Sequence, residues 1–196
     1  MKIFLTVLGA SIVLASAAHA TVLNFDDLEA GGKLASIAPH NPYAGLAWSS
    51  SWYLGDTAVA GYGNGAHSGT NFLTNGYGVN NLAIASTTGF DFGGGWFATP
   101  ATNGAHASWI NISAYDSAGL LIGSTGNLAI GASYTFIAAN FSNVARLNIA
   151  RDKGWFVMDD LSIASASAVP EPGSFALTAL GCATLAALRW RRKMPA

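Results

Sequence analysis

The chain has 196 residues, of which 51% are hydrophobic and 10% are charged, and its formal net charge is −1. Residues 21–168 hold four Lys or Arg against nine Asp or Glu, a net charge of −5, and have no basic cluster. Nucleic acids and anionic lipid surfaces need several Lys or Arg to neutralise phosphates, so this composition argues against both as partners. A single cysteine, Cys182, excludes a disulfide within the chain.

The N-terminus predicts a secretory signal peptide over residues 1–20. Lys2 precedes an uncharged, mainly apolar run from Ile3 to Ala17, and Ala18 and Ala20 are the small residues that signal peptidase reads. We expect cleavage after Ala20, so that the mature chain begins at residue 21. The alternative is an uncleaved signal anchor, for which the run is short.

Residues 21–168 predict one domain built from antiparallel strands. Several segments alternate apolar with polar or small residues at period two, which is typical of half-buried strands. Turn compositions at 116–119 and 123–126 separate some of them, and no stretch keeps an amphipathic helical pattern over three turns. We predict an all-β fold, an antiparallel β-sandwich or jelly roll. The expected strands are residues 23–25, 109–115, 133–137, 145–150 and 155–163.

Aromatic residues gather in the less regular segment between residues 39 and 77, where we expect long surface loops. Trp48 and Trp52 are four apart, a spacing that puts both on one face of a strand and favours burial. A competing hypothesis places aromatic side chains at the surface, where their rings stack on sugars. Tyr53 and Trp96 are the candidates for such a ligand-binding platform.

Two acidic pairs, Asp26 with Asp27 and Asp159 with Asp160, lie near the first and last expected strands. If these strands are neighbours, four carboxylates approach one another, and a structural calcium ion is the cofactor that such oxygen ligands suit. The alternative is that one Asp of each pair faces solvent, as strand alternation requires, and the other caps a turn.

Catalytic motifs are weak. His40, His67 and His106 form no metal-ligand pair at helical or strand spacing, and the Gly93–Gly95 run lacks the Lys and Ser or Thr of a phosphate loop. No Gly-x-Ser-x-Gly elbow occurs. We therefore predict a non-catalytic body. The alternative is a secreted polysaccharide-acting enzyme, a glycoside hydrolase or lyase, which needs a cleft with two converging carboxylates.

The C-terminal tail, residues 169–196, has three parts. A Val-Pro-Glu-Pro element precedes an uncharged apolar run of sixteen residues from Gly173 to Leu188. As a helix this run is roughly 24 Å long, short of the ~30 Å hydrocarbon core, so it predicts a marginal single transmembrane helix. The cations that follow should stay in the cytoplasm and place the body outside. They are Arg189, Arg191, Arg192 and Lys193.

This order of motif, helix and basic cluster resembles the PEP-CTERM sorting signal of Gram-negative bacteria. The resemblance implies export, transient anchoring in the inner membrane, and cleavage by an exosortase near the sorting motif. It also implies delivery to the cell surface or an extracellular polysaccharide matrix. The alternative is an ordinary C-terminal tail anchor. The residues carried over to the sorting motif are Val169, Pro170, Glu171 and Pro172.

Short motifs in the body are similar to those of sandwich domains found in PEP-CTERM proteins, which resemble galactose-binding-like and other carbohydrate-binding modules in layout. This likeness implies a matrix component or a carbohydrate-binding module, with polysaccharide as a partner. The motifs are residues 25–28, 42–48, 89–97, 115–119 and 157–161.

The basic cluster yields a test of sorting. When its four cations are replaced by neutral residues, the positive charge that holds the C-terminus in the cytoplasm is gone, so we expect loss of correct processing. Cell fractionation and the size of the processed chain measure this outcome. Unchanged processing and localisation would show that the cluster does not fix the topology.

Overall fold

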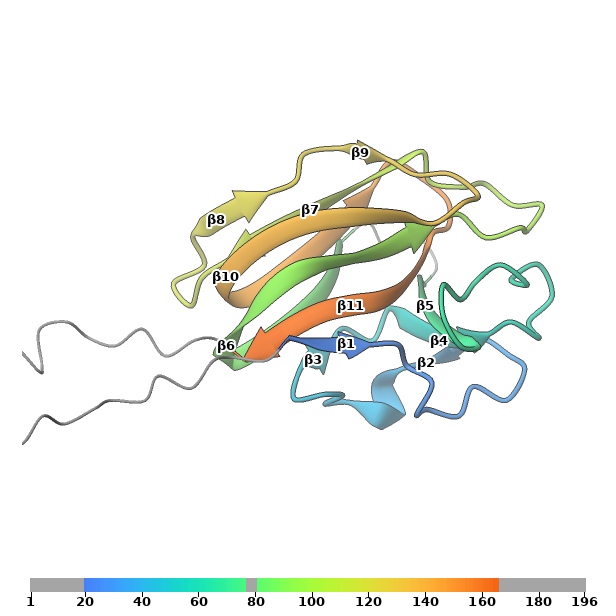
Figure 1. Cartoon of the computed structure of the whole chain (residues 1–196), viewed down its shortest axis with the longest axis horizontal. Coiled ribbons are helices and arrows are strands. Elements are labelled where there is room, and N and C mark those ends of the chain that lie inside the picture. The colour runs from blue at the N-terminus through green and yellow to red at the C-terminus, as the bar shows by residue number, and fades with distance from the viewer. Residues whose placement is uncertain (1–19, 77–80, 166–196) are drawn as a thin grey trace, which may run out of the picture.

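The computed structural model describes residues 20–76 and 81–165 (Figure 1). The predicted signal peptide up to residue 19, including Ala18, lies outside this range, and so do the sorting motif, the predicted membrane helix and the cations after it. Within the described ranges, no helix is long and apolar enough to cross a membrane.

The described chain is almost entirely strand, with one short 3-10 helix. The elements, in chain order, are β1 (Thr21–Leu23), β2 (Ala35–Ser36), η1 (Ala38–His40), β3 (Ala47–Trp48), β4 (Trp52–Asp56), β5 (Asn71–Asn75), β6 (Asn81–Ala98), β7 (Trp109–Tyr115), β8 (Leu121–Ser124), β9 (Leu128–Ala129), β10 (Thr135–Arg151) and β11 (Val157–Ser165).

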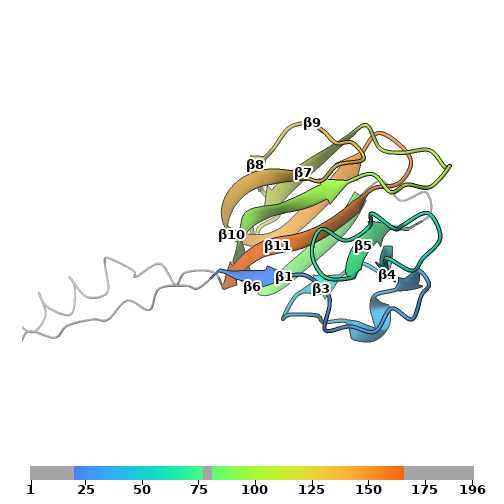
Figure 2. The ribbon, with the colours of Figure 1, turned by 45° about the vertical axis from the view of Figure 1, so that its right-hand side comes forward.

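Two long strands, β6 and β10, organise a sheet of order β2-β4-β5-β11-β6-β10-β7-β8, in which all paired strands are antiparallel. The C-terminal half of β6 pairs with β11 and with the start of β10, whereas its N-terminal half pairs with β3 and the end of β10. Register shifts between Ala138 and Arg146 mark the change, and such bulges bend strands. In both views β8 and β9 lie on the side of the molecule opposite β3 and β4 (Figures 1 and 2).

One apolar core joins the inner faces of both halves of the sheet. Trp48 and Trp52 are both buried in it, which confirms the burial predicted from their spacing. Their rings meet edge to face at 6.2 Å, and Trp52 meets Phe156 of the segment before β11 in the same way at 6.0 Å. These offset contacts stabilise the packing beyond simple burial, because the positive edge of one ring faces the negative face of the next.

The predicted all-β antiparallel class is confirmed. Strand β7 has the bounds that alternation predicted. Of the strand expected at 133–137, residues 135–137 begin β10, and the segment expected at 145–150 lies in the same bent strand. The first and last strands are neighbours, since Thr21 pairs with Ile163 and Leu23 with Leu161.

Gly94 of β6 lies so close to the backbone of β10 that a side chain does not fit between the two strands. Its φ is +143°, and a Cβ there would overlap the carbonyl oxygen of Ile137 and lie 2.9 Å from the ring of Phe136. A side chain at this position therefore forces β6 and β10 apart. Gly131, by contrast, has open space where its Cβ would be.

We expect Gly94→Ala to lower the free energy of unfolding by at least about 2 kcal/mol, through backbone strain and overpacking. Gly131→Ala, the matched control, should change it by no more than about 0.5 kcal/mol. Urea denaturation of both variants measures the difference. Equal midpoints for the two variants would contradict the close approach at Gly94.

Candidate functional site

The loop between β4 and β5 is laid across the outer face of the sheet. Tyr62 of this loop stacks on Phe72 of β5 at 5.3 Å, with the ring planes 6° apart. Ala98 and Val157, from the ends of β6 and β11, complete a second small apolar cluster beneath the loop. This packing carries the next part of the loop, around His67, to the middle of the sheet.

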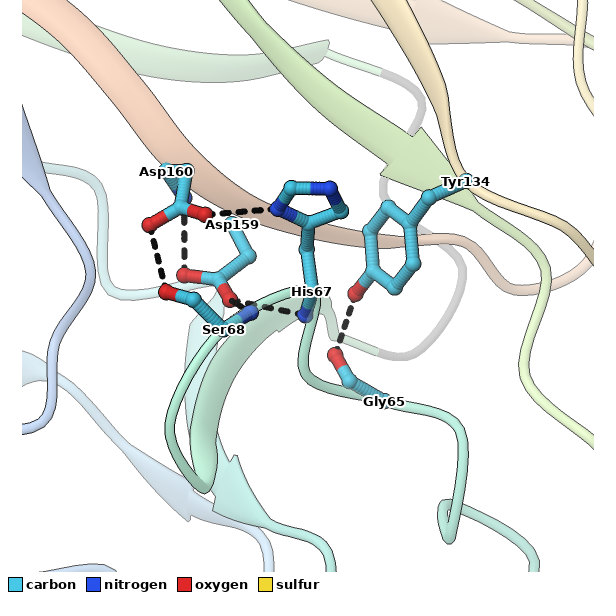
Figure 3. A network of polar contacts seen from close by, with 6 residues as sticks. All are labelled: Gly65, His67, Ser68, Tyr134, Asp159 and Asp160. Atoms are coloured by element: carbon cyan, nitrogen blue, oxygen red, sulfur yellow. Dashed lines mark hydrogen bonds and ion pairs between the residues drawn. The ribbon is translucent and has the colours of Figure 1, made fainter.

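Two carboxylates hold the backbone of that segment. Asp159 of β11 accepts the N–H groups of His67 at 2.8 Å and Ser68 at 3.0 Å (Figure 3). Asp26 accepts the next pair of N–H groups along the loop, those of Thr70 at 2.8 Å and Asn71 at 2.9 Å. Two side chains thereby satisfy four backbone donors at the end of the loop and the start of β5.

A bulge in β11 turns a second acid toward the same loop. The register of β11 with β6 shifts between Asp159 and Ser162, and Asp160 has φ +48°. As a result, Asp160 lies beside Asp159 instead of on the opposite face (Figure 3). Its Oδ2 is 2.6 Å from His67 Nδ1, and its Oδ1 accepts the Ser68 hydroxyl at 2.7 Å.

His67 is thereby fixed against an aromatic group that we call the aromatic patch, made of His67, Trp96, Tyr134 and Phe136. The His67 ring stacks on Trp96 of β6 at 4.0 Å with the planes 13° apart, and Tyr134 meets His67 edge-on at 5.3 Å. Phe136 of β10 is directly across the ladder from Trp96, with ring centroids 5.4 Å apart. Its side chain is 44% exposed, so the patch presents an aromatic face to solvent.

Burial raises the pKa values of two groups beside the patch. Burial raises the pKa of Asp159 to about 7, and the neighbouring charge of Asp160 adds to the rise, while the N–H donors of Ser68, Asp160 and His67 oppose it. Burial, followed by the charges of Asp159 and Asp160, also raises the pKa of Tyr134. The Tyr134 hydroxyl therefore stays protonated and donates to the carbonyl of Gly65 (Figure 3).

An open hollow lies where β6, β10 and β11 change register. Its volume is about 240 Å³, and its lining includes Gly93 and the apolar residues Ala20, Phe92, Phe141 and Ala164. Trp96 lies three residues from Gly93, roughly 10 Å along an extended strand. Groups able to donate or accept hydrogen bonds line the hollow, namely Asp91, Asn140, Ser142 and Ser162.

The two predicted platform residues are not brought together. Tyr53 of β4 is half-buried, and its ring lies over Gly76, where a Cβ would be 2.7 Å away. β5 and β11 separate β4 from β6, so Tyr53 and Trp96 are about 14 Å apart at ordinary strand spacing. Only Trp96 belongs to the aromatic patch.

The predicted metal ligands have protein partners. Asp26 and Asp159 bind the loop backbone, Asp160 binds His67 and Ser68, and Asp27 accepts the Tyr43 hydroxyl at 2.7 Å. Among the residues that the structure describes, no group of three or more His, Cys, Asp or Glu side chains could hold a metal ion. The calcium site stays a prediction.

Sequence reasoning missed His67 and Phe136 as members of the site. His67 lies in a Gly-rich loop with no pattern that ties it to a strand. Phe136 carried a usable signal, since it belongs to the expected strand 133–137 and alternates with Ile137, which is buried.

The tail matches a known family model. Residues 168–193 match the model described as the PEP-CTERM protein-sorting motif, so the predicted resemblance is confirmed for the tail. No curated protein matches the chain.

Among solved structures, the chain resembles the N-terminal CBM22-1-CBM22-2 tandem domain of Paenibacillus barcinonensis Xyn10C, with 11% identity and a TM-score of 0.47. The match covers 83% of this chain and 49% of the tandem structure, so the chain spans about half of it. A CBM29-2 carbohydrate-binding module, as its D114A mutant, matches at 13% identity over 81% of this chain and 100% of its own, with a TM-score of 0.44. The K2 cleaved adhesin domain of Lys-gingipain matches at 9% identity over 74% and 99%, with a TM-score of 0.45.

The raised pKa of Asp159 predicts how stability depends on pH. An Asp in an unfolded chain has a pKa of about 3.9. Between that value and about 7 the folded state binds more protons than the unfolded state, so the free energy of unfolding should fall as pH rises through this window. Asp159→Asn removes the titrating group. Across this pH window its free energy of unfolding should therefore fall by less than that of the wild type, with a difference of up to about 4 kcal/mol.

Urea denaturation at several pH values between 4 and 8 measures the two profiles. Because other groups of the protein contribute to both profiles, the difference between wild type and variant is the quantity of interest. Asp116→Asn, on the turn between β7 and β8, serves as the control and should keep the wild-type slope. Parallel profiles for wild type and Asp159→Asn would refute the role given to Asp159.

Proposed function

We propose that this protein is an exported, non-catalytic polysaccharide-binding protein of the cell surface or extracellular matrix of a Gram-negative bacterium. A PEP-CTERM motif marks an exported protein that is transiently anchored in a membrane, and its match supports this part of the proposal. In the proposed route, signal peptidase acts after Ala20 and an exosortase acts near Pro170–Pro172. The domain of residues 21–168 is then released outside the cell.

The observation that carries the binding role is the aromatic patch, together with the hollow on the same strands. A sugar ring has an apolar C–H face that stacks on an aromatic ring and hydroxyl groups at its rim that need hydrogen-bond partners. Phe136 and Trp96 offer the first, and Asn140, Ser142 and Ser162 offer the second. About 10 Å separates Trp96 from the hollow, which suits a polymer of several sugar units better than a single sugar.

The electrostatics favour an uncharged polymer. Asp91 lines the hollow and Asp160 contacts His67 of the patch, whereas neither the patch nor the described lining of the hollow contains Lys or Arg. An anionic polysaccharide would meet these carboxylates without a compensating cation, which costs electrostatic free energy. We therefore expect neutral glycans to bind in preference to acidic ones.

The rigidity of the patch supports recognition. His67, stacked on Trp96, is held by Asp160, and its backbone by Asp159, so the rings have fixed positions before a ligand arrives. A preorganised surface loses less conformational entropy on binding than a mobile one does. A purely structural matrix protein needs no such preformed aromatic surface, which is the ground for preferring the binding role.

We expect the protein to be retarded in affinity gels that contain a neutral polysaccharide such as xylan, mannan or β-glucan. Phe136→Ala should weaken this binding by about 1 to 3 kcal/mol, the loss expected when an interface anchor is truncated, and Trp96→Ala should do the same. Because Phe136 is largely exposed, its truncation should leave the melting temperature nearly unchanged.

Tyr53→Ala is the matched control, an aromatic truncation on the same sheet outside the patch, and it should bind like the wild type. Retardation that depends on Tyr53 and not on Phe136 would move the site to β4. No retardation of the wild type in any gel would leave only the matrix role. Repeating the gels with calcium and with EDTA tests the predicted ion, since loss of binding in EDTA would support it.

A further inference from the structure

Strand β8 forms an open edge of the sheet. It ends the strand order, and together with β9 it pairs with β7, from Tyr115 at one end to Trp109 at the other. Within the described ranges, no strand pairs with the outer side of β8. In an antiparallel ladder, alternate N–H and C=O groups of an edge strand point away from its partner, so β8 presents backbone groups that another strand can bind.

Exposed apolar side chains concentrate at this edge. Leu120, Leu121 and Ile122 are 66%, 59% and 44% exposed, and Leu128 of β9 is also exposed. Of the six large apolar side chains that are exposed in the described part of the chain, these are four. Single exposed apolar residues are ordinary, but three in succession on an open edge are typical of an interaction surface.

The charge distribution identifies the partner that this edge suits. Residues 117–145, which include β8, β9 and the first half of β10, contain no Asp, Glu, Lys or Arg. Soluble proteins usually protect an open edge with charges, and this edge has none. Because residues 21–168 have a net charge of −5, two copies repel each other over most of their surface. At the uncharged edge they can approach without a pair of like charges.

Antiparallel pairing about a two-fold axis also keeps the flanking acids apart. Asp116 closes the turn that leads into β8, accepting the N–H groups of Ala118 and Leu120. In a two-fold arrangement the start of one β8 lies opposite the end of the other. The two Asp116 side chains therefore sit at opposite ends of the interface.

We propose that β8 pairs with β8 of a second copy of this chain, joining two molecules edge to edge. The backbone of each strand supplies hydrogen bonds, and Leu120, Leu121 and Ile122 of each copy become buried. Such an interface is isologous, because the same surface serves both partners. It does not depend on sugar binding.

Sedimentation velocity of the full chain in density-matched detergent tests the proposal. Wild type should form dimers as its concentration rises, whereas Leu121→Glu, which adds repelling charges to the edge, should raise the dimer dissociation constant at least about tenfold, as for loss of a central contact. Val22→Glu is the matched control, since Val22 is 58% exposed on β1, and it should dimerise like wild type. The tail is the same in all three proteins, so its contribution cancels.

Circular dichroism checks that the variants fold. If Leu121→Glu does not, Leu121→Ser removes the apolar surface without adding charge, and it should weaken the dimer by a smaller factor. A wild type that stays monomeric at all concentrations would overturn the proposal, as would equal dimerisation of the Leu121 and Val22 variants. Binding of the monomer to neutral phosphatidylcholine vesicles, lost in Leu121→Glu, would overturn it in favour of a lipid surface.

Discussion

The carboxylate of Asp159 is the constraint on which the candidate site depends. A loop laid on the face of a sheet has no ladder to receive its N–H groups, and each unsatisfied donor near the protein interior destabilises the fold. Asp159 receives those of His67 and Ser68, and Asp26 receives those of Thr70 and Asn71. Asp26 follows β1 and Asp159 belongs to β11, two strands that pair with each other. Both strands therefore have to be in place for the loop to be held at both points.

Fixing the loop creates the chemistry of the surface. His67 reaches Trp96 because its backbone is held by Asp159, and its ring keeps one orientation because Asp160 binds Nδ1. The patch then combines a rigid aromatic face with polar groups in the neighbouring hollow, which is the combination that recognition of a neutral polysaccharide requires. This arrangement buries the Asp159 carboxylate, which costs free energy and raises its pKa.

The two proposed surfaces are compatible with each other. Strand β8 is three strands from β6 in the sheet, about 14 Å at ordinary spacing. A dimer joined at β8 would carry two aromatic patches. Two linked sites bind a polymer more tightly than one, since the second contact forms at a high effective concentration. If the proposed binding role holds, this coupling strengthens binding to a polysaccharide, because such a ligand repeats along its length.

The sequence predicted the features that follow from local pattern. Alternation located β7, and even spacing placed Trp48 and Trp52 in the core. It failed where long-range structure overrides pattern. β6 is a strand of eighteen residues, but its glycines interrupt the alternating pattern that would predict it. The bulged strand needs these glycines for its close approach to β10.

The direction of the Asp160 side chain also could not be predicted from local pattern. Strict alternation sends Asp159 and Asp160 to opposite faces, and only the bulge in β11 turns both toward the loop. The partners of these acids come from a loop about 90 residues earlier in the chain, as the separation of 92 between His67 and Asp159 shows. No local pattern encodes such a contact, so the sequence did not predict that Asp159 and Asp160 bind this loop.

Amide hydrogen exchange of the folded protein tests this account most directly. If Asp159 and Asp26 hold the loop, the N–H groups of His67, Ser68, Thr70 and Asn71 should exchange far more slowly than those of the exposed turn at residues 131–133. In Asp159→Asn the protection of His67 and Ser68 should fall while that of β7 is retained. Exchange of the four loop amides in wild type as fast as that of the turn would contradict the account.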